Sequence, residues 1–229
     1  MKKLIICAVT AILAAISPAR AISLFENNQA GWNSMVTTLV VTTINWDDLS
    51  LANGTSQTIP GNQYSGLTGS PTLSVDAGSG LYVIDPGPSF FQEDFITVSG
   101  ENVFAPDDYP ASPQGILTIS FGTPVYALGA WFLDVEGDYA GTGIKVGGTL
   151  YAFSANQGDN SQSFLGIVSI TPFTTVEIYM ANGPVSDGVG IDDIVYAVPE
   201  PATLFLLGLG GLSLRLRSLR QAQGKQDRF

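Results

Sequence analysis

The stretch GILTISF at residues 115–121 alternates apolar and polar side chains. Its leucine, second isoleucine and phenylalanine share one face, and its threonine and serine share the other. This two-residue period is that of a β-strand with one buried face. TTVEIYMA at residues 174–181 repeats the pattern, with valine, isoleucine and methionine on the apolar face. Both stretches therefore predict strands that border a hydrophobic core.

Other short runs rich in β-branched and aromatic residues are separated by clusters of Gly, Pro, Asn and Asp, which favour turns. None of them shows a sustained helical period. We expect an all-β fold, an antiparallel β-sandwich of jelly-roll type with roughly nine to eleven strands. The further predicted strands are MVTTLVVTTI (35–44), GLYVID (80–85), DFITVS (94–99), VYALGAWFLDV (125–135), TLYAFSA (149–155), SFLGIVSI (163–170) and GIDDIVYA (190–197).

The charge of this body is strongly acidic. Residues 22–197 contain eighteen Asp and Glu residues and one basic residue, Lys145. Such a surface repels phosphate backbones, so we expect no nucleic-acid partner. The chain has no histidine, and its one cysteine, Cys7, lies near the N-terminus. Hydrolases of the serine–histidine and thiol types are therefore excluded, and we expect a protein that is not an enzyme.

The N-terminus has the pattern of a secretory signal peptide. Two lysines follow Met1, residues 4–16 are almost unbroken apolar sequence, and Ala19 and Ala21 form a small-x-small cleavage site. We therefore expect residues 1–21 to be removed after export through the Sec machinery, which leaves the exported chain without cysteine.

The C-terminus combines a turn motif, an apolar run and a basic cluster. Pro199 and Pro201 flank Glu200 and are expected to end the strand ladder at residue 197. Residues 202–214 would span about 20 Å as a helix, less than the roughly 30 Å of a bilayer core. The arginines that follow place the tail in the cytoplasm and the body outside. They are Arg215, Arg217 and Arg220.

The string VPEPATLFLLGLGGLSLRLRSLR at residues 198–220 resembles the PEP-CTERM sorting signal of Gram-negative bacteria. The resemblance implies a sorting signal over residues 198–229, with a motif at 198–201, an apolar helix at 202–214 and a basic tail at 215–229. It also implies that a membrane-embedded exosortase recognises Val198, Pro199, Glu200 and Pro201, and that the protein crosses the inner membrane and reaches the cell surface. The extra QAQGKQDRF at the end departs from the family pattern, and a single-span anchor that is never cut is the alternative.

The body also resembles the exported domains found ahead of such tails, because its last strands close on IDDI, as in lectin-like and carbohydrate-binding sandwiches. In those sandwiches an Asp of the closing strand often ligates a structural calcium ion. The resemblance therefore implies calcium at Asp192 or Asp193. Asp134, near the end of the predicted strand at 125–135, is a candidate to approach the closing strand and share the ion. Because neighbours on a strand point to opposite faces, Asp192 and Asp193 are not expected to act as a pair. The alternative is that Asp193 caps a turn or meets solvent.

Two tryptophans in polar surroundings, Trp32 and Trp46, are candidate stacking platforms for sugar rings. Our leading hypothesis is a structural or adhesive component of the surface polysaccharide or biofilm matrix, and the alternative is a calcium-dependent glycan-binding module. A glycosidase that uses Asp47 and Asp48 is a weaker alternative, since a pair of acids is the minimum for that chemistry. Ice binding is weaker still, because the threonine pairs of the chain follow no repeat.

Overall fold

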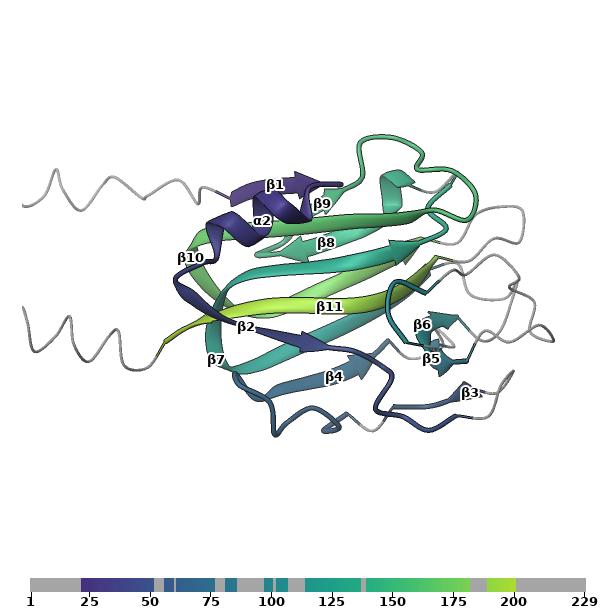
Figure 1. Cartoon of the computed structure of the whole chain (residues 1–229), viewed down its shortest axis with the longest axis horizontal. Coiled ribbons are helices and arrows are strands. Elements are labelled where there is room, and N and C mark those ends of the chain that lie inside the picture. Colours follow the sequence, from purple (N-terminus) through teal and green to yellow (C-terminus); the bar gives the residue numbers. More distant parts are fainter. Residues whose placement is uncertain are drawn as a thin grey trace, which may run out of the picture.

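The structure is a computed structural model. It describes residues 22–51, 56–59, 61–76, 81–85, 97–100, 102–106, 114–136, 139–181 and 189–200. These residues form antiparallel strands and one short α-helix, which confirms the expected all-β fold (Figure 1). The strands are β1 (Ile22–Glu26), β2 (Leu39–Ile44), β3 (Ser56–Gln57), β4 (Pro71–Val75), β5 (Leu81–Ile84), β6 (Val103–Pro106), β7 (Gln114–Leu133), β8 (Gly143–Val146), β9 (Thr149–Ala152), β10 (Gln162–Ala181) and β11 (Gly190–Pro199). The helix is α2 (Gln29–Met35), and a 3-10 turn, η1, spans Tyr139–Gly141.

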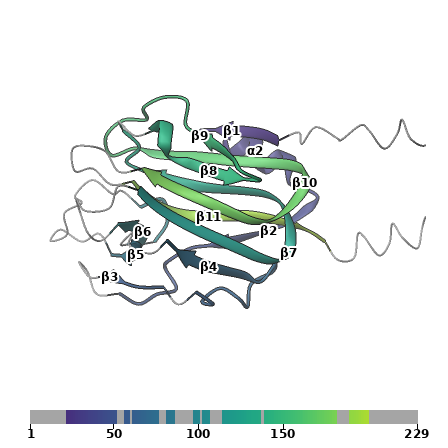
Figure 2. The ribbon, with the colours of Figure 1, turned by 180° about the vertical axis from the view of Figure 1, so that it is seen from behind.

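Two long strands, β7 and β10, belong to both layers of the sandwich. They pair with each other from one end to the other, and their register shifts between Val168 and Thr175. Figures 1 and 2 show both strands curving strongly at one end of the molecule. Four of the predicted strands therefore form two continuous strands. The predictions at 115–121 and 125–135 both fall in β7, which ends two residues earlier, at Leu133. The predictions at 163–170 and 174–181 both fall in β10.

The pairings divide the sheet into two layers. In the first layer the order is β1, the N-terminal half of β10, the C-terminal half of β7, β11 and β2. In the second layer it is β9, β8, the C-terminal half of β10, the N-terminal half of β7 and β4. A small group, β3–β5–β6, joins β11 through the pair Ile191 and Phe104. The antiparallel β-sandwich is thus confirmed, with eleven strands in the described part of the chain.

The main core lies between the two layers. The apolar faces predicted at 115–121 and 174–181 are buried there, together with the inward side chains of β11. The first layer is also covered on its other face, where α2 packs with Trp32 against Phe164. Side chains on both faces of β11 are therefore buried, and its sequence is continuously apolar from Ile194 to Val198.

Helix α2 begins at a capped end and lies flat on the first layer. The Asn28 side chain accepts a hydrogen bond from the Gly31 N–H at 2.9 Å, which caps the helix. The Trp32 indole N–H donates to the Ile167 carbonyl at 3.1 Å. Residues 35–38 were predicted as strand, but the helix and the turn after it occupy them, and β2 begins only at Leu39.

Candidate functional site

A β-bulge in the closing strand brings Asp192 and Asp193 to the same neighbour. The register between β11 and β7 shifts between Ile191 and Ile194, so the two acids do not alternate across a regular strand. An Asp192 oxygen accepts hydrogen bonds from the Val98 N–H and, at 2.9 Å, from the Ser99 N–H. An Asp193 oxygen accepts one from the Ser99 hydroxyl at 3.0 Å. Both side chains therefore reach Ser99, although neighbours on a regular strand point to opposite faces.

Asp47 completes this cluster. Its carboxylate accepts from the Asn102 N–H at 3.2 Å and from the Ser99 hydroxyl at 3.4 Å. We call Asp47, Asp192 and Asp193, gathered around Ser99, the bulge cluster. It ties Val98 and Ser99 to the closing strand, and Asn102 to Asp47.

The bulge cluster places a carboxyl group in an unfavourable environment. Asp192 is fully buried, and within the described part of the chain its second oxygen, Oδ1, has no hydrogen-bond partner. Burial raises the pKa of Asp192 to about 6; the two backbone N–H donors oppose this, and the neighbouring Asp193 and Asp47 add to it. Burial also raises the pKa of Asp193. Asp192 therefore keeps its proton to a higher pH than an exposed aspartate does.

A second acidic group lies where β7 ends. Asp134, Glu136 and Asp159 each offer a carboxylate oxygen, and these oxygens all lie within 4.8 Å of one another. Asp134 is 3% exposed and accepts from the Asn160 N–H at 2.9 Å. Calcium binds carboxylate oxygens at 2.3–2.6 Å, so this spacing suits a single ion. We call these three residues the carboxylate triad.

The carboxylate triad changes the predicted ligand set. Among the residues that the structure describes, it is the one group of three potential ligands with this spacing, so Asp134 belongs with Glu136 and Asp159 and not with Asp192 and Asp193. The sequence places Asp134 and Glu136 on one face of an extended chain. Asp159 comes from a distant loop, and no sequence pattern pointed to it.

The two tryptophans predicted as sugar platforms are core residues. Trp32 and Trp46 are both 0% exposed, so the prediction was wrong. Trp46 stacks on Phe104 with ring centroids 5.0 Å apart, and its indole N–H donates to the Asp192 carbonyl at 2.8 Å. The polar sequence around each tryptophan suggested exposure, but a backbone carbonyl satisfies each indole N–H inside the core.

The acids considered for a glycosidase make structural hydrogen bonds. Asp48 accepts from the Tyr64 hydroxyl at 2.9 Å, and burial, with Asp48 as the next cause, raises the pKa of Tyr64. Asp47 belongs to the bulge cluster. Asp47 and Asp48 also line an open cavity of about 400 Å³ with Gly100 and Asn102.

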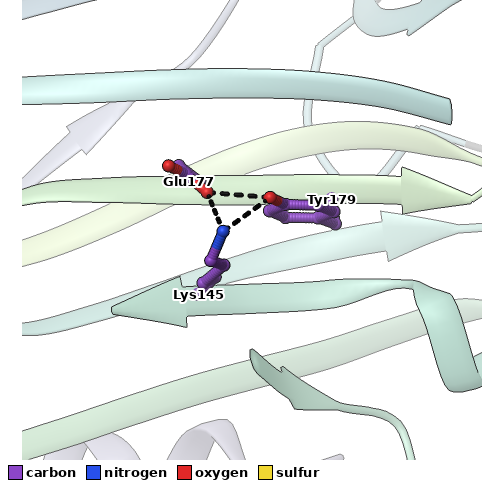
Figure 3. Close-up of polar contacts among 3 residues, drawn as sticks. All are labelled: Lys145, Glu177 and Tyr179. Atoms are coloured by element: carbon purple, nitrogen blue, oxygen red, sulfur yellow. Dashed lines mark hydrogen bonds and ion pairs between the residues drawn. The ribbon is translucent and has the colours of Figure 1, made fainter. Parts of the chain in front are cut away.

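The outer face of the second layer carries a polar group around the one basic residue of the body. The Lys145 ammonium lies 2.8 Å from the Glu177 carboxylate and donates to the Tyr179 hydroxyl at 2.8 Å, and that hydroxyl donates to Glu177 at 2.9 Å (Figure 3). The ammonium hydrogen bond lowers the pKa of Glu177, and the same contact raises the pKa of Lys145. Glu177 and Tyr179 border a cleft of about 240 Å³ that Ser74, Asp76 and Thr118 also line; we call it the polar cleft.

The turn motif of the C-terminus begins inside the fold. Strand β11 continues to Pro199, and Val198 and Pro199 are paired with Val40 and Leu39 of β2. Val198 is 2% exposed and packs in the main core, whereas Glu200 is exposed. The strand thus extends two residues beyond the expected boundary at residue 197. Pro199 is tolerated because it is the last residue of the strand, where no further ladder hydrogen bond is needed.

Several predicted residues lie outside the part of the chain that the structure describes. They are Ala19 and Ala21 of the cleavage site, Pro201, and Arg215, Arg217 and Arg220. Within the described residues, the structure has no helix with the length and hydropathy needed to cross a bilayer.

Comparison with known protein families identifies the C-terminal pattern. Residues 197–221 match the PEP-CTERM protein-sorting motif. The chain carries this sorting motif, which indicates an exported surface protein. No curated protein matches the chain. Among solved structures, TmCBM61, a carbohydrate-binding module in complex with beta-1,4-galactotriose, aligns with 63% of this chain and 100% of its own, at 18% identity and a TM-score of 0.34.

Proposed function

We propose that the protein is exported through the Sec machinery, held at the inner membrane by residues 202–214, processed by an exosortase at Pro199–Pro201, and then incorporated into the surface polysaccharide or biofilm matrix. The sandwich there has a structural or adhesive role. The observation that carries this proposal is the sorting motif at residues 197–221, which begins inside the last core strand. The strongly acidic body supports it, because such a domain stays soluble outside the cell.

The test is mass spectrometry of the protein recovered from the cell surface of an exosortase-containing host. We expect an N-terminus at Ile22 and loss of the C-terminal residues RQAQGKQDRF (220–229). The variant Glu200→Ala alters the exposed part of the motif and is expected to stay uncut. Glu177→Gln, which changes an acid in the second layer and outside the motif, is the matched control. Surface material that keeps residues 220–229 would contradict processing.

A second function, calcium-dependent glycan binding, is favoured by the carboxylate triad. We propose that Asp134, Glu136 and Asp159 would hold calcium, which would neutralise their charges and join the end of β7 to the loop around Asp159. With both tryptophans buried, Tyr179 and the polar cleft are the proposed contact surface for a sugar.

Calcium should raise the melting temperature of the protein, and a chelator should reverse the effect. Asp159→Asn is expected to abolish the response, whereas Asp48→Asn, which changes an acid outside the triad, is expected to keep it. A glycan array then tests binding, with Tyr179→Ala as the variant that should lose it. A melting temperature that changes with neither calcium nor chelator would exclude the calcium-dependent form of this function.

A further inference from the structure

The predicted signal peptide and the apolar run at 202–214 adjoin the same end of the sandwich. The described chain begins at Ile22, next to the predicted signal peptide, and ends at Glu200, next to the apolar run at 202–214. Figure 1 shows the start of β1 and the end of β11 at the same end of the molecule. The register agrees, because one row of cross-strand partners across the first layer runs through Ser23, Val168, Ala127, Ala197 and Val41. Ile22 and Val198 each lie one residue beyond that row, on the same side.

The other segments at this end are bends and turns. Ile22 shares a cavity of about 380 Å³ with the bends of β7 and β10 and with Gly147 of the β8–β9 turn. Gly122 of the β7 bend donates to the Gly69 carbonyl at 2.9 Å, and Leu39, which follows the turn after α2, pairs with Pro199. We call this surface the junction end. It consists of residues 22–23, 35–38, 68–70, 122–124, 147–148, 169–175 and 198–200.

The composition of the junction end differs from that of the rest of the body. Glu200 is its one charged residue in an otherwise strongly acidic protein. Ile170 is 66% exposed and Met35 is 54% exposed, the two highest values among the large apolar side chains that the structure describes. Several threonines, among them Thr171 and Thr174, supply hydroxyl groups beside them. Apolar side chains next to hydroxyl groups suit the boundary between lipid headgroups and acyl chains.

The carboxylate triad and the bulge cluster lie at the opposite end. The carboxylate triad begins directly after β7 ends, and the bulge cluster lies near the start of β11, which pairs with the end of β7. The stretch of β7 from Val125 to Leu133 is about 26 Å long at roughly 3.3 Å per residue. That length is about three times the Debye length of roughly 8 Å at physiological ionic strength. Anionic lipids at the junction end would therefore be screened from these acids.

We propose that the junction end is a membrane-facing surface, which rests on the phospholipid bilayer that the apolar run at 202–214 enters. This inference rests on the proposed function, because it requires the exported chain to be anchored. Ile170 and Met35 contact the headgroup boundary, and the threonine hydroxyls bond to headgroup oxygens. The long strands then run away from the bilayer surface, and the carboxylate triad and the bulge cluster lie at the end of the sandwich that is distant from the bilayer.

Single-cysteine labelling tests this orientation, because Cys7 is the chain's one cysteine and can be replaced by serine. The full chain with Cys7→Ser is labelled with bimane at Ile170→Cys or, as a control at the opposite end, at Ser154→Cys, which is exposed. Each form is reconstituted into phosphatidylcholine vesicles that contain a lipid with a nitroxide headgroup. We expect the nitroxide to quench bimane fluorescence at residue 170 and to leave the fluorescence at residue 154 unchanged.

Sedimentation of the same vesicles separates the two proposals. Chain that pellets with the vesicles but is quenched equally at both positions, or only at residue 154, would overturn the membrane-facing surface and leave the proposed function intact. Chain that stays in the supernatant would contradict the membrane anchor and this inference together. Unchanged melting temperatures of the labelled variants would show that neither cysteine disturbs the fold.

Discussion

Asp192 is fully buried, one of its oxygens accepts hydrogen bonds from two backbone N–H groups, and it has two acidic neighbours. Its pKa, about 6, lies above the usual value near 3.9 of an exposed Asp, so the folded state keeps this proton where the unfolded state has lost it. The free energy of unfolding should therefore fall as pH rises from about 4 to about 6 and then level off, by up to about 3 kcal/mol. Urea unfolding across this range, in the presence of chelator, measures the slope.

Asp192→Asn is the variant that assigns this slope to one residue. The amide oxygen can still accept from the Val98 and Ser99 N–H groups, but the side chain no longer titrates. We expect the variant to lose most of the pH dependence. Asp48→Asn, which changes an exposed acid, should keep it. Equal slopes in Asp192→Asn and the unchanged protein would show that another group is responsible.

The ion pair between Lys145 and Glu177, unlike the buried Asp192, lies near the surface, since both side chains are about one-third exposed. Ion pairs of this kind contribute little to stability, and salt screens them. We expect Lys145→Met to shift the urea midpoint slightly at low salt and not at all in concentrated sodium chloride. A large shift that survives high salt would mean that the lysine stem, and not its charge, stabilises the outer face of the second layer.

At the scale of elements, the contact of α2 with the first layer depends on two glycines. Gly129 of β7 and Gly166 of β10 are direct cross-strand partners. A Cβ atom on Gly166 would lie 2.6 Å from the Trp32 ring, and one on Gly129 would lie 2.5 Å from the Phe164 ring. We expect Gly166→Ala to lower the free energy of unfolding by about 1–3 kcal/mol through overpacking. The matched control is Gly66→Ala, whose Cβ would meet no atom within 4 Å. Equal stability of the two variants would contradict a close contact under α2.

The strands were predictable where one face is buried. Alternation at 115–121 and 174–181 revealed the halves of β7 and β10 that border the main core. It could not show that each half continues into a second layer, because a bend depends on pairing partners far away in the chain. Helix α2 was missed because a helix of 7 residues is too short to show a helical period.

The site was less predictable than the strands. The IDDI pattern pointed to Asp192 and Asp193, but the bulge that turns both toward Ser99 depends on pairing with β7. Exposure of Trp32 and Trp46 was inferred from polar neighbours in sequence, whereas the core that covers them comes from distant strands. Local patterns report the faces of single strands, and convergence of residues from several strands is a property of the topology.

At the scale of the whole molecule, the fold and the sorting motif share residues. The motif match starts at residue 197, and β11 ends at Pro199. A cut before Val198 would remove a side chain that is 2% exposed and packs in the main core. A cut after Pro199 would leave the strand intact. The position of the last strand therefore favours processing on the C-terminal side of Pro199.

Two truncated chains test this argument directly. A chain of residues 22–197 lacks Val198 and the last two pairings with β2, whereas a chain of residues 22–200 keeps them. Burial of one valine side chain is worth about 1.5–3 kcal/mol, so we expect the shorter chain to be less stable by about 2 kcal/mol in urea unfolding. Removal of Glu200 alone, in a chain of residues 22–199, is the control and should change little, because this side chain is exposed. If all three chains unfold at the same urea concentration, the last residues of β11 add nothing to the core, and a cut before Val198 would be equally compatible with the fold.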